Sequence, residues 1–170
     1  MLLPATANDV EALVDVQQEG AIRGLSHIFP QDDFPFPRAA VVAPWHEEIA
    51  EAGTRAYICR DSAGNVSGFA ATRGDELLHF GTSVHTWGSG LAQALHDAVL
   101  EALAVTAPAE ATYARLRVFE DNRRARRFYQ RLGWAETPNR TRTRFPPHPT
   151  LIELRRALDE AGRALICGRL

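Results

Sequence analysis

The sequence predicts a single α+β domain, a three-layer α/β arrangement with a mixed, mostly antiparallel sheet of six or seven strands and helices on both faces. Short runs typical of strands occur along the chain, and segments with helical periodicity lie between them. Two of the strand runs are joined by a turn-forming cluster at 61–65. The 170 residues suit one compact core. We therefore assign 1–158 to one domain and 159–170 to a C-terminal tail.

The N-terminal half is predicted to place two helices before a hairpin. Thr6 and Asp9, three residues apart, form the pattern of a capping box at the start of the first helix. Proline and aromatic residues recur so closely after His27 that no helix is expected before Trp45. Gly53 is a normal stop signal for the second helix. The predicted elements are a strand at 2–5, helices at 10–22 and 45–52 with a loop at 27–44 between them, and strands at 55–60 and 66–72.

The C-terminal half is predicted to alternate strands with helices. A strand leads into a glycine-rich turn, after which apolar residues four positions apart mark an amphipathic helix. A later strand is followed by Asn122, which opens a helix that Gly133 ends. The predicted elements are strands at 77–80, 112–119, 140–145 and 151–158, and helices at 91–103 and 122–132.

Composition excludes several classes of function. The net charge of -2 argues against a nucleic-acid partner, and the 45% apolar and 24% charged residues are typical of a soluble globular protein. No apolar run is as long as a membrane span, so no membrane partner is expected. Cys59 and Cys167 fit no metal-ligand spacing and are more typical of a reducing compartment than of a disulfide framework. We expect a cytoplasmic protein with a small-molecule partner, and the oligomeric state stays open, a homodimer included.

The glycine-rich turn is a candidate phosphate site. Between a strand and a helix, backbone N–H groups are left unpaired, and the helix dipole favours an anion. Gly88 and Gly90 have no Cβ, so a pyrophosphate could approach the backbone closely. The alternative is a tight turn without a ligand, because the segment is neither a Walker loop nor a complete dinucleotide fingerprint. The candidate residues are His85, Thr86, Trp87, Gly88, Ser89 and Gly90.

A second segment is more specific. Residues 118–134 read VFEDNRRARRFYQRLGW. They resemble the strand-to-helix segment of the GNAT superfamily of N-acetyltransferases, in which Asn, Ala, Phe-Tyr and Gly-Phe/Trp occur at these intervals. The glycine-rich loop of that family reads Arg/Gln-x-x-Gly-x-Gly/Ala and lies about 35 residues upstream of the Asn, where 85–90 stands here. The resemblance covers most of the chain, except the 27–44 loop and the tail beyond Leu158.

The resemblance implies a reaction and a set of roles. Acetyl-CoA would be the acyl-donor substrate, no metal would be needed, and a primary amine would attack the thioester directly in a ternary complex. Tyr129 would lie near the sulfur and protonate the departing thiolate, with simple packing as the alternative. Leu77, Leu78 and His79 would pair with the pantetheine arm like an added strand, residues 85–90 would hold the pyrophosphate, and Asn122 would hydrogen-bond the pantetheine. The alternative function is a catalytically inactive acyl-CoA-binding sensor or structural module.

The general base cannot be transferred from the family. Several members use a Glu on the strand before the Asn, where this chain has Arg115 and Arg117. His79 is our catalytic candidate for this role, with Glu76 and Glu120 as further options. A strand histidine satisfied by its neighbours is the alternative for His79.

The loop at 27–44 is the candidate acceptor site. Acidic and aromatic groups suit a cation, and long loops in compact domains are often functional. An ordinary surface loop is the alternative, and a small polyamine or antibiotic, an amino acid and a protein N-terminus all stay open as acceptors. The candidate substrate-binding residues are Asp32, Asp33, Phe34 and Phe36. The arginines at 123–131 are interpreted as a solvated face, of which one or two could meet the 3′-phosphate of CoA.

Overall fold

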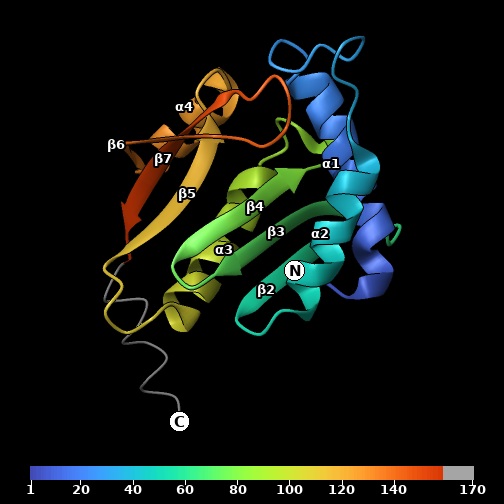
Figure 1. Ribbon diagram of the computed structural model, residues 1–170. Helices are drawn as coiled ribbons and strands as arrows, with labels where there is room; N and C mark the ends of the chain where they lie inside the picture. Colours follow the sequence, from blue (N-terminus) through green and yellow to red (C-terminus); the bar gives the residue numbers. More distant parts are fainter. Residues whose placement is uncertain (159–170) are drawn as a thin grey trace.

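The computed structural model describes residues 1–158 and shows a seven-stranded sheet with helices on both faces (Figure 1). The strands are β1 (Leu3–Pro4), β2 (Thr54–Arg60), β3 (Val66–Arg73), β4 (Glu76–Thr82), β5 (Tyr113–Phe119), β6 (Ala135–Arg142) and β7 (Thr150–Ala157). The helices are α1 (Val10–Gly24), α2 (Arg38–Ala50), α3 (Leu91–Thr106) and α4 (Arg123–Arg131), with 3-10 turns at Ala7–Asp9 and Val84–Thr86. The predicted fold class is confirmed, and the predicted tail at 159–170 lies outside the described residues.

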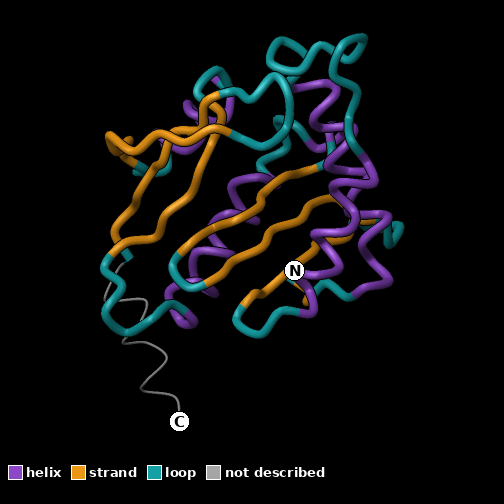
Figure 2. Tube along the Cα trace, viewed as in Figure 1, coloured by secondary structure: helices purple, strands orange, loops and turns teal. Residues whose placement is uncertain are grey.

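The strands run in the order β1-β2-β3-β4-β5-β7-β6. Every neighbouring pair is antiparallel except β4 and β5, which are parallel. Helices α1 and α2 cover one face of the sheet and α3 covers the other, with α4 beside β5 (Figures 1 and 2). None of the helices in the described part of the chain has the length and apolar character needed to cross a membrane.

Two apolar cores follow from the helical patterns. Val10, Leu13 and Val14 of α1 are fully buried and pack with Trp45 of α2 against β2 and β3. On the other face, Leu95, Val99 and Leu103 of α3 are buried with β5, β7 and α4, as the four-residue spacing of these apolar residues predicts. The two cores hold β4 between them, since Leu77 belongs to the α3 side and Leu78 to the α1 side.

The predicted capping box is present before α1. The backbone N–H and the hydroxyl of Thr6 both donate to the Asp9 carboxylate, at 2.8 and 2.7 Å. Arg60 of β2 forms an ion pair with the same carboxylate. Burial alone would raise the pKa of Asp9, but these hydrogen bonds and the Arg60 charge hold it below its ordinary value. The pair fixes the start of α1 on β2.

The predicted start of α2 is wrong. The helix begins at Arg38 rather than at Trp45, so the loop is shorter than the predicted 27–44, and Pro44 lies inside the helix. Proline removes the N–H that would bond to the carbonyl of Ala40, and a guanidinium N–H of Arg144 donates to that carbonyl instead, at 3.5 Å. Trp45, which is 1% exposed, anchors the helix in the core. Tertiary packing therefore overrides the proline signal.

The predicted bounds of β6 are also wrong. The strand spans Ala135–Arg142 rather than 140–145. Its register with β7 shifts between Glu136 and Arg140, which places Pro138 in the irregular stretch. Because β6 ends the sheet order, Pro138 is accommodated at an edge, where proline is tolerated.

Candidate functional site

The parallel strands β4 and β5 separate soon after they begin. They pair only at Glu76 with Arg115 and at Leu77 with Leu116. Beyond these pairs β4 continues to Thr82 and β5 to Phe119 without pairing to each other, and the space between their ribbons widens toward their C-terminal ends (Figures 1 and 2). Backbone groups on this side of β4 therefore have no partner strand in the described chain. Such a strand edge can accept an extended ligand.

A β-bulge lies at the point where the strands separate. Ala71 of β3 pairs with His79, whereas Thr72 pairs with Leu77, so Leu78 is an extra residue in β4. A bulge locally interrupts the ladder and redirects side chains, and bulges are common next to active sites. The three residues predicted to face the pantetheine arm, Leu77 to His79, are therefore the ones at which β4 leaves β5.

His79 forms a pair that sequence reasoning missed. Its Nε2 lies 2.8 Å from Oε2 of Glu48 in α2, and the centroids of its ring and the Trp45 ring are 4.6 Å apart. Its Nδ1 has no hydrogen-bond partner among the described residues. If the Glu48 carboxylate accepts from Nε2–H, Nδ1 carries the lone pair that can take a proton. The signal was absent from the sequence because 31 residues separate Glu48 from His79.

The other base candidates are engaged in ion pairs. Glu76 accepts from Nε of Arg117 at 3.0 Å, beside the Asp75–Arg115 pair at the narrow end of the opening. Glu120 lies 3.9 Å from Arg140 of β6. Both carboxylates therefore face a guanidinium, which leaves His79 as the base candidate that is not paired with an arginine.

The glycine-rich loop has free amides. Gly88 and Gly90 have φ of +86° and +90°, and a Cβ at either position would meet no atom within 4 Å. Their N–H groups donate to no acceptor in the described chain. Gly90 stands directly before α3, whose positive dipole end adds to the potential there. Open space, free donors and a helix N-terminus together suit a phosphate.

Side chains of the same loop mostly hold its shape. The Thr86 hydroxyl donates to the carbonyl of Ser83 at 2.7 Å, and the Ser89 hydroxyl to that of Thr86 at 2.6 Å. The indole N–H of Trp87 donates to the carbonyl of Thr82 at 3.3 Å. His85 is exposed and lies 3.6 Å from Glu19 of α1. The loop thus offers backbone donors, while its one ionisable side chain faces α1.

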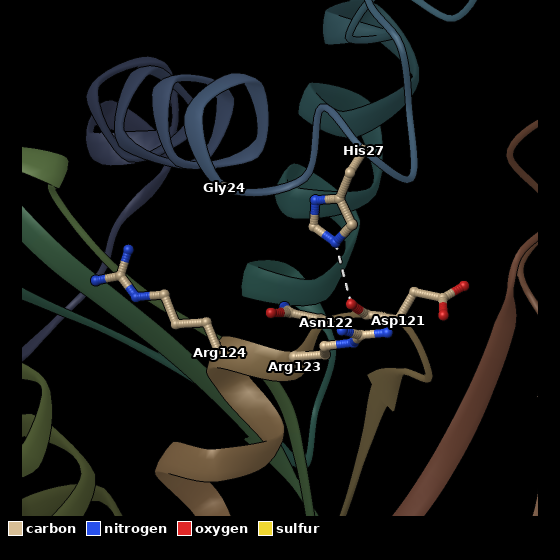
Figure 3. Close-up of a pocket in the computed structure, with 6 residues that line it drawn as sticks. All are labelled: Gly24, His27, Asp121, Asn122, Arg123 and Arg124. Carbon is tan, nitrogen blue, oxygen red and sulfur yellow. Dashed lines mark hydrogen bonds between the residues drawn. The ribbon is translucent and has the colours of Figure 1, made fainter.

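A pocket of about 460 Å³ lies at the start of α4 (Figure 3). His27 reaches from the α1–α2 loop to the carbonyl oxygen of Asp121, at 3.0 Å. The Oδ1 atom of Asn122 accepts from the N–H of Ala125 at 3.1 Å and so caps α4, while its Nδ2 has no partner among the described residues. The lining residues are Gly24, His27, Asp121, Asn122, Arg123 and Arg124.

Tyr129 lies on the inner face of α4. It is 7% exposed, and its ring lies in edge contact with Phe80 of β4 and with Phe128 and Trp134. Its hydroxyl makes no hydrogen bond to a described residue, which is uncommon for a buried phenol. Burial raises the pKa of Tyr129 above its ordinary value, so the phenol keeps its proton at neutral pH.

His96 of α3 is a buried polar residue that sequence reasoning missed. It is fully buried, its Nε2 accepts from the indole N–H of Trp134 at 2.9 Å, and its Nδ1 lies 3.0 Å from Asp97. This arrangement requires the tautomer with the proton on Nδ1. Burial lowers the pKa of His96, which favours the neutral ring. The ring also borders Tyr129, at 6.4 Å between centroids.

The predicted acceptor residues differ in exposure. Asp32 and Asp33 are exposed, and Phe34 is half-buried. Phe36 packs against the core beneath α1 and α2. The loop is organised by Gln31, whose amide bonds to three backbone groups within 29–36. The loop contacts the β5–α4 segment in two places, through His27 and through the edge contact of Phe29 with Phe119, whose ring centroids are 5.2 Å apart.

Comparison with known proteins gives a family and a set of similar folds. A sequence profile described as the acetyltransferase (GNAT) family matches residues 20–134. A search of curated protein sequences found no match. The solved ribosomal-protein-S18-alanine N-acetyltransferase from Escherichia coli is similar with a TM-score of 0.67 and 17% identity, over 94% of each chain.

Two further solved structures show the same fold. The PaiA N-acetyltransferase from Thermoplasma acidophilum, in complex with coenzyme A, has a TM-score of 0.69 and 13% identity over 90% of this chain and 96% of that one. A mutant of the spermidine N-acetyltransferase from Vibrio cholerae has a TM-score of 0.65 and 11% identity over 93% of this chain and 95% of that one.

Proposed function

The chain belongs to the GNAT family of acetyltransferases, and from this premise we propose that it transfers the acetyl group of acetyl-CoA to a primary amine of a small molecule or peptide. The family match confirms the resemblance predicted from 118–134 and from the glycine-rich loop. The site residues and the acceptor are our proposal.

The separation of β4 from β5 is the observation that carries this proposal. After Leu77 the edge of β4 has no partner strand among the described residues, so the pantetheine arm can bind there as an added strand. At the wide end, the free N–H groups of Gly88 and Gly90 are available for the pyrophosphate. Across the opening, the unpaired Nδ2 of Asn122 can donate to a pantetheine carbonyl.

The chemistry proposed is direct acyl transfer. The neutral amine attacks the thioester carbonyl, an N–C bond forms, and the C–S bond breaks. His79, held by Glu48, takes the proton that the amine must lose, directly or through water. A backbone N–H of β4 near the bulge stabilises the oxyanion, and the Tyr129 hydroxyl protonates the departing thiolate.

A thiol-release assay tests the function. Acetyl-CoA would be incubated with the protein and a panel of amines that includes a polyamine, an aminoglycoside-type antibiotic, free amino acids and peptides with different N-terminal residues. We expect CoA to raise the melting temperature and at least one amine to release thiol in proportion to enzyme. Stabilisation by CoA without turnover of any amine would favour the inactive sensor or structural module.

A further inference from the structure

The side chains of Trp87 and Arg124 meet across the wide end of the opening between β4 and β5. The Cζ atom of Arg124 lies 3.5 Å from the centroid of the Trp87 ring. Trp87 belongs to the loop that follows β4, and Arg124 to the first turn of α4, which follows β5. This cation–π contact therefore joins the loop after β4 to the start of α4, beyond the ends of the two separated strands.

The Trp87 ring is held in place from two other sides. Its N–H donates to the carbonyl of Thr82 at the end of β4, at 3.3 Å. On the α1 side it packs against Gly24, where an added Cβ would lie 3.5 Å from the ring. The indole is thus a fixed platform on which the guanidinium of Arg124 stacks beside the loop.

Arg124 has a charge without an acidic partner. No ion pair or hydrogen bond to its guanidinium occurs among residues 1–158, whereas Arg115, Arg117 and Arg126 each pair with a carboxylate. The side chains of Arg123 and Arg124 extend in opposite directions from the start of α4 (Figure 3). Partial burial lowers the pKa of Arg124, but a guanidinium remains charged at neutral pH. A cation held against a loop of free amides is suited to an anionic ligand.

The loop itself supplies no other cation. His85, its one ionisable residue, is 78% exposed at its side chain and is directed to Glu19. The free N–H groups of Gly88 and Gly90 carry only partial charges. A full positive charge on a neighbouring element would strengthen the binding of a diphosphate there, and Arg124 contacts the loop through Trp87.

We propose that Arg124, stacked on Trp87, is the cation that binds the diphosphate of acetyl-CoA at the glycine-rich loop. The inference rests on the proposed function, because it assumes that the loop holds this cofactor. Arg124 acts on binding of the acyl donor and not on the chemistry of transfer. Trp87 acts as a positioning residue, because it fixes the guanidinium over the loop.

Binding of three ligands to Arg124→Gln tests the proposal. Titration calorimetry would compare CoA, dephospho-CoA, which lacks the 3′-phosphate, and pantetheine, which lacks the adenosine together with the diphosphate and the 3′-phosphate. We expect Arg124→Gln to bind CoA and dephospho-CoA about tenfold more weakly than wild type, and pantetheine equally well. Arg127→Gln, an equal change of charge on an exposed residue one turn along α4, is the matched control, and its affinities should stay within about twofold.

The stack has its own test. In a Trp87→Leu background, Arg124→Gln should weaken CoA binding less than it does in wild type, because the platform is already gone. Unchanged CoA affinity in Arg124→Gln would overturn the proposal. If Arg124→Gln lost affinity for CoA but not for dephospho-CoA, Arg124 would lie at the 3′-phosphate and the proposal would be overturned. An equal loss of affinity for pantetheine would also overturn it, because that result indicates a structural role. Wild-type protein that fails to bind CoA would instead refute the proposed function on which the inference rests.

Discussion

Nε2 of His79 lies 2.8 Å from Oε2 of Glu48, and this contact connects the point where β4 leaves β5 to helix α2. A carboxylate that accepts from one ring nitrogen fixes the orientation and the tautomer of the ring, so that the other nitrogen can act as a base. Trp45 of the same helix also packs on the His79 ring, so α2 contacts this histidine through two side chains.

We predict that His79→Gln lowers kcat by roughly a hundredfold to a thousandfold and leaves acetyl-CoA affinity unchanged. Glu48→Gln should lower kcat less, by about tenfold, because the ring loses its orienting charge but keeps a hydrogen-bond partner. Steady-state kinetics on an amine acceptor from the panel would measure both effects. Glu47→Gln, at an exposed neighbouring position, is the control and should behave as wild type. Equal kcat for His79→Gln and wild type would exclude His79 as the base.

The glycine-rich loop gives the second prediction. Gly88→Asp should abolish the rise in melting temperature caused by CoA, because a carboxylate would stand where the phosphates need N–H donors. Positive φ makes any side chain at this position strained, so the variant will be less stable even without ligand. Gly64→Asp is matched for this strain, since Gly64 has φ of +88° and lies in the β2–β3 turn. Only Gly64→Asp should keep the CoA-induced shift.

The third prediction separates two roles of Asn122. Asn122→Ala removes the cap of α4 and should cost about 1 kcal/mol of stability, in addition to weakening CoA binding. Asn122→Asp keeps an oxygen to accept from Ala125 but loses the Nδ2 donor. It should therefore melt close to wild type and bind CoA more weakly, by the order of one hydrogen bond, or about 1 kcal/mol. Full CoA affinity in Asn122→Asp would limit the role of Asn122 to capping.

The sequence predicted those structural elements of the candidate site whose signals are local. The loop 85–90 and the segment that starts at Asn122 are contiguous motifs, and a backbone position with positive φ is usually occupied by glycine, which is visible in the sequence. The pairs His79–Glu48 and His96–Trp134 join residues 31 and 38 positions apart, and no local pattern encodes them. The same limit explains the wrong start of α2, because the carbonyl that Pro44 leaves free is met by Arg144 from the far end of the chain.

The fourth prediction concerns the hydrogen bond between His96 and Trp134. His96→Leu should destabilise the fold by about 1–3 kcal/mol, because the buried indole N–H loses its acceptor. Adding Trp134→Phe removes that unsatisfied donor, so the double variant should be more stable than the sum of the single changes predicts. Denaturant unfolding of wild type, the two single variants and the double variant would measure this coupling. Additive changes in the free energy of unfolding would indicate that the hydrogen bond contributes little.

The same residue predicts a pH dependence. Burial lowers the pKa of His96 in the folded protein, so the unfolded chain binds a proton at this position first as the pH falls. Stability from this group is therefore fully present above the ordinary histidine pKa of about 6.5 and is lost as the pH decreases below it. His96→Leu should show a smaller loss of stability than wild type between neutral and mildly acidic pH.

The fifth prediction is that Tyr129→Phe keeps acetyl-CoA binding but loses roughly tenfold to a thousandfold in turnover. The substitution leaves the ring contacts with Phe80 and Trp134 in place and removes only the hydroxyl. Because that hydroxyl has no hydrogen-bond partner in the described chain, its removal should not lower the melting temperature. Calorimetry and thiol release would measure binding and turnover separately.

The pH profile sharpens this last test. Burial raises the pKa of Tyr129, so the phenol keeps its proton to higher pH than an ordinary tyrosine and should impose no high-pH decline on the wild-type rate across the usual assay range. Any such decline must come from another group, and Tyr129→Phe should lower the rate by the same factor at every pH rather than shift the profile. If Tyr129→Phe matches wild type in kcat throughout this range, the phenol is a packing residue and the thiolate takes its proton from water.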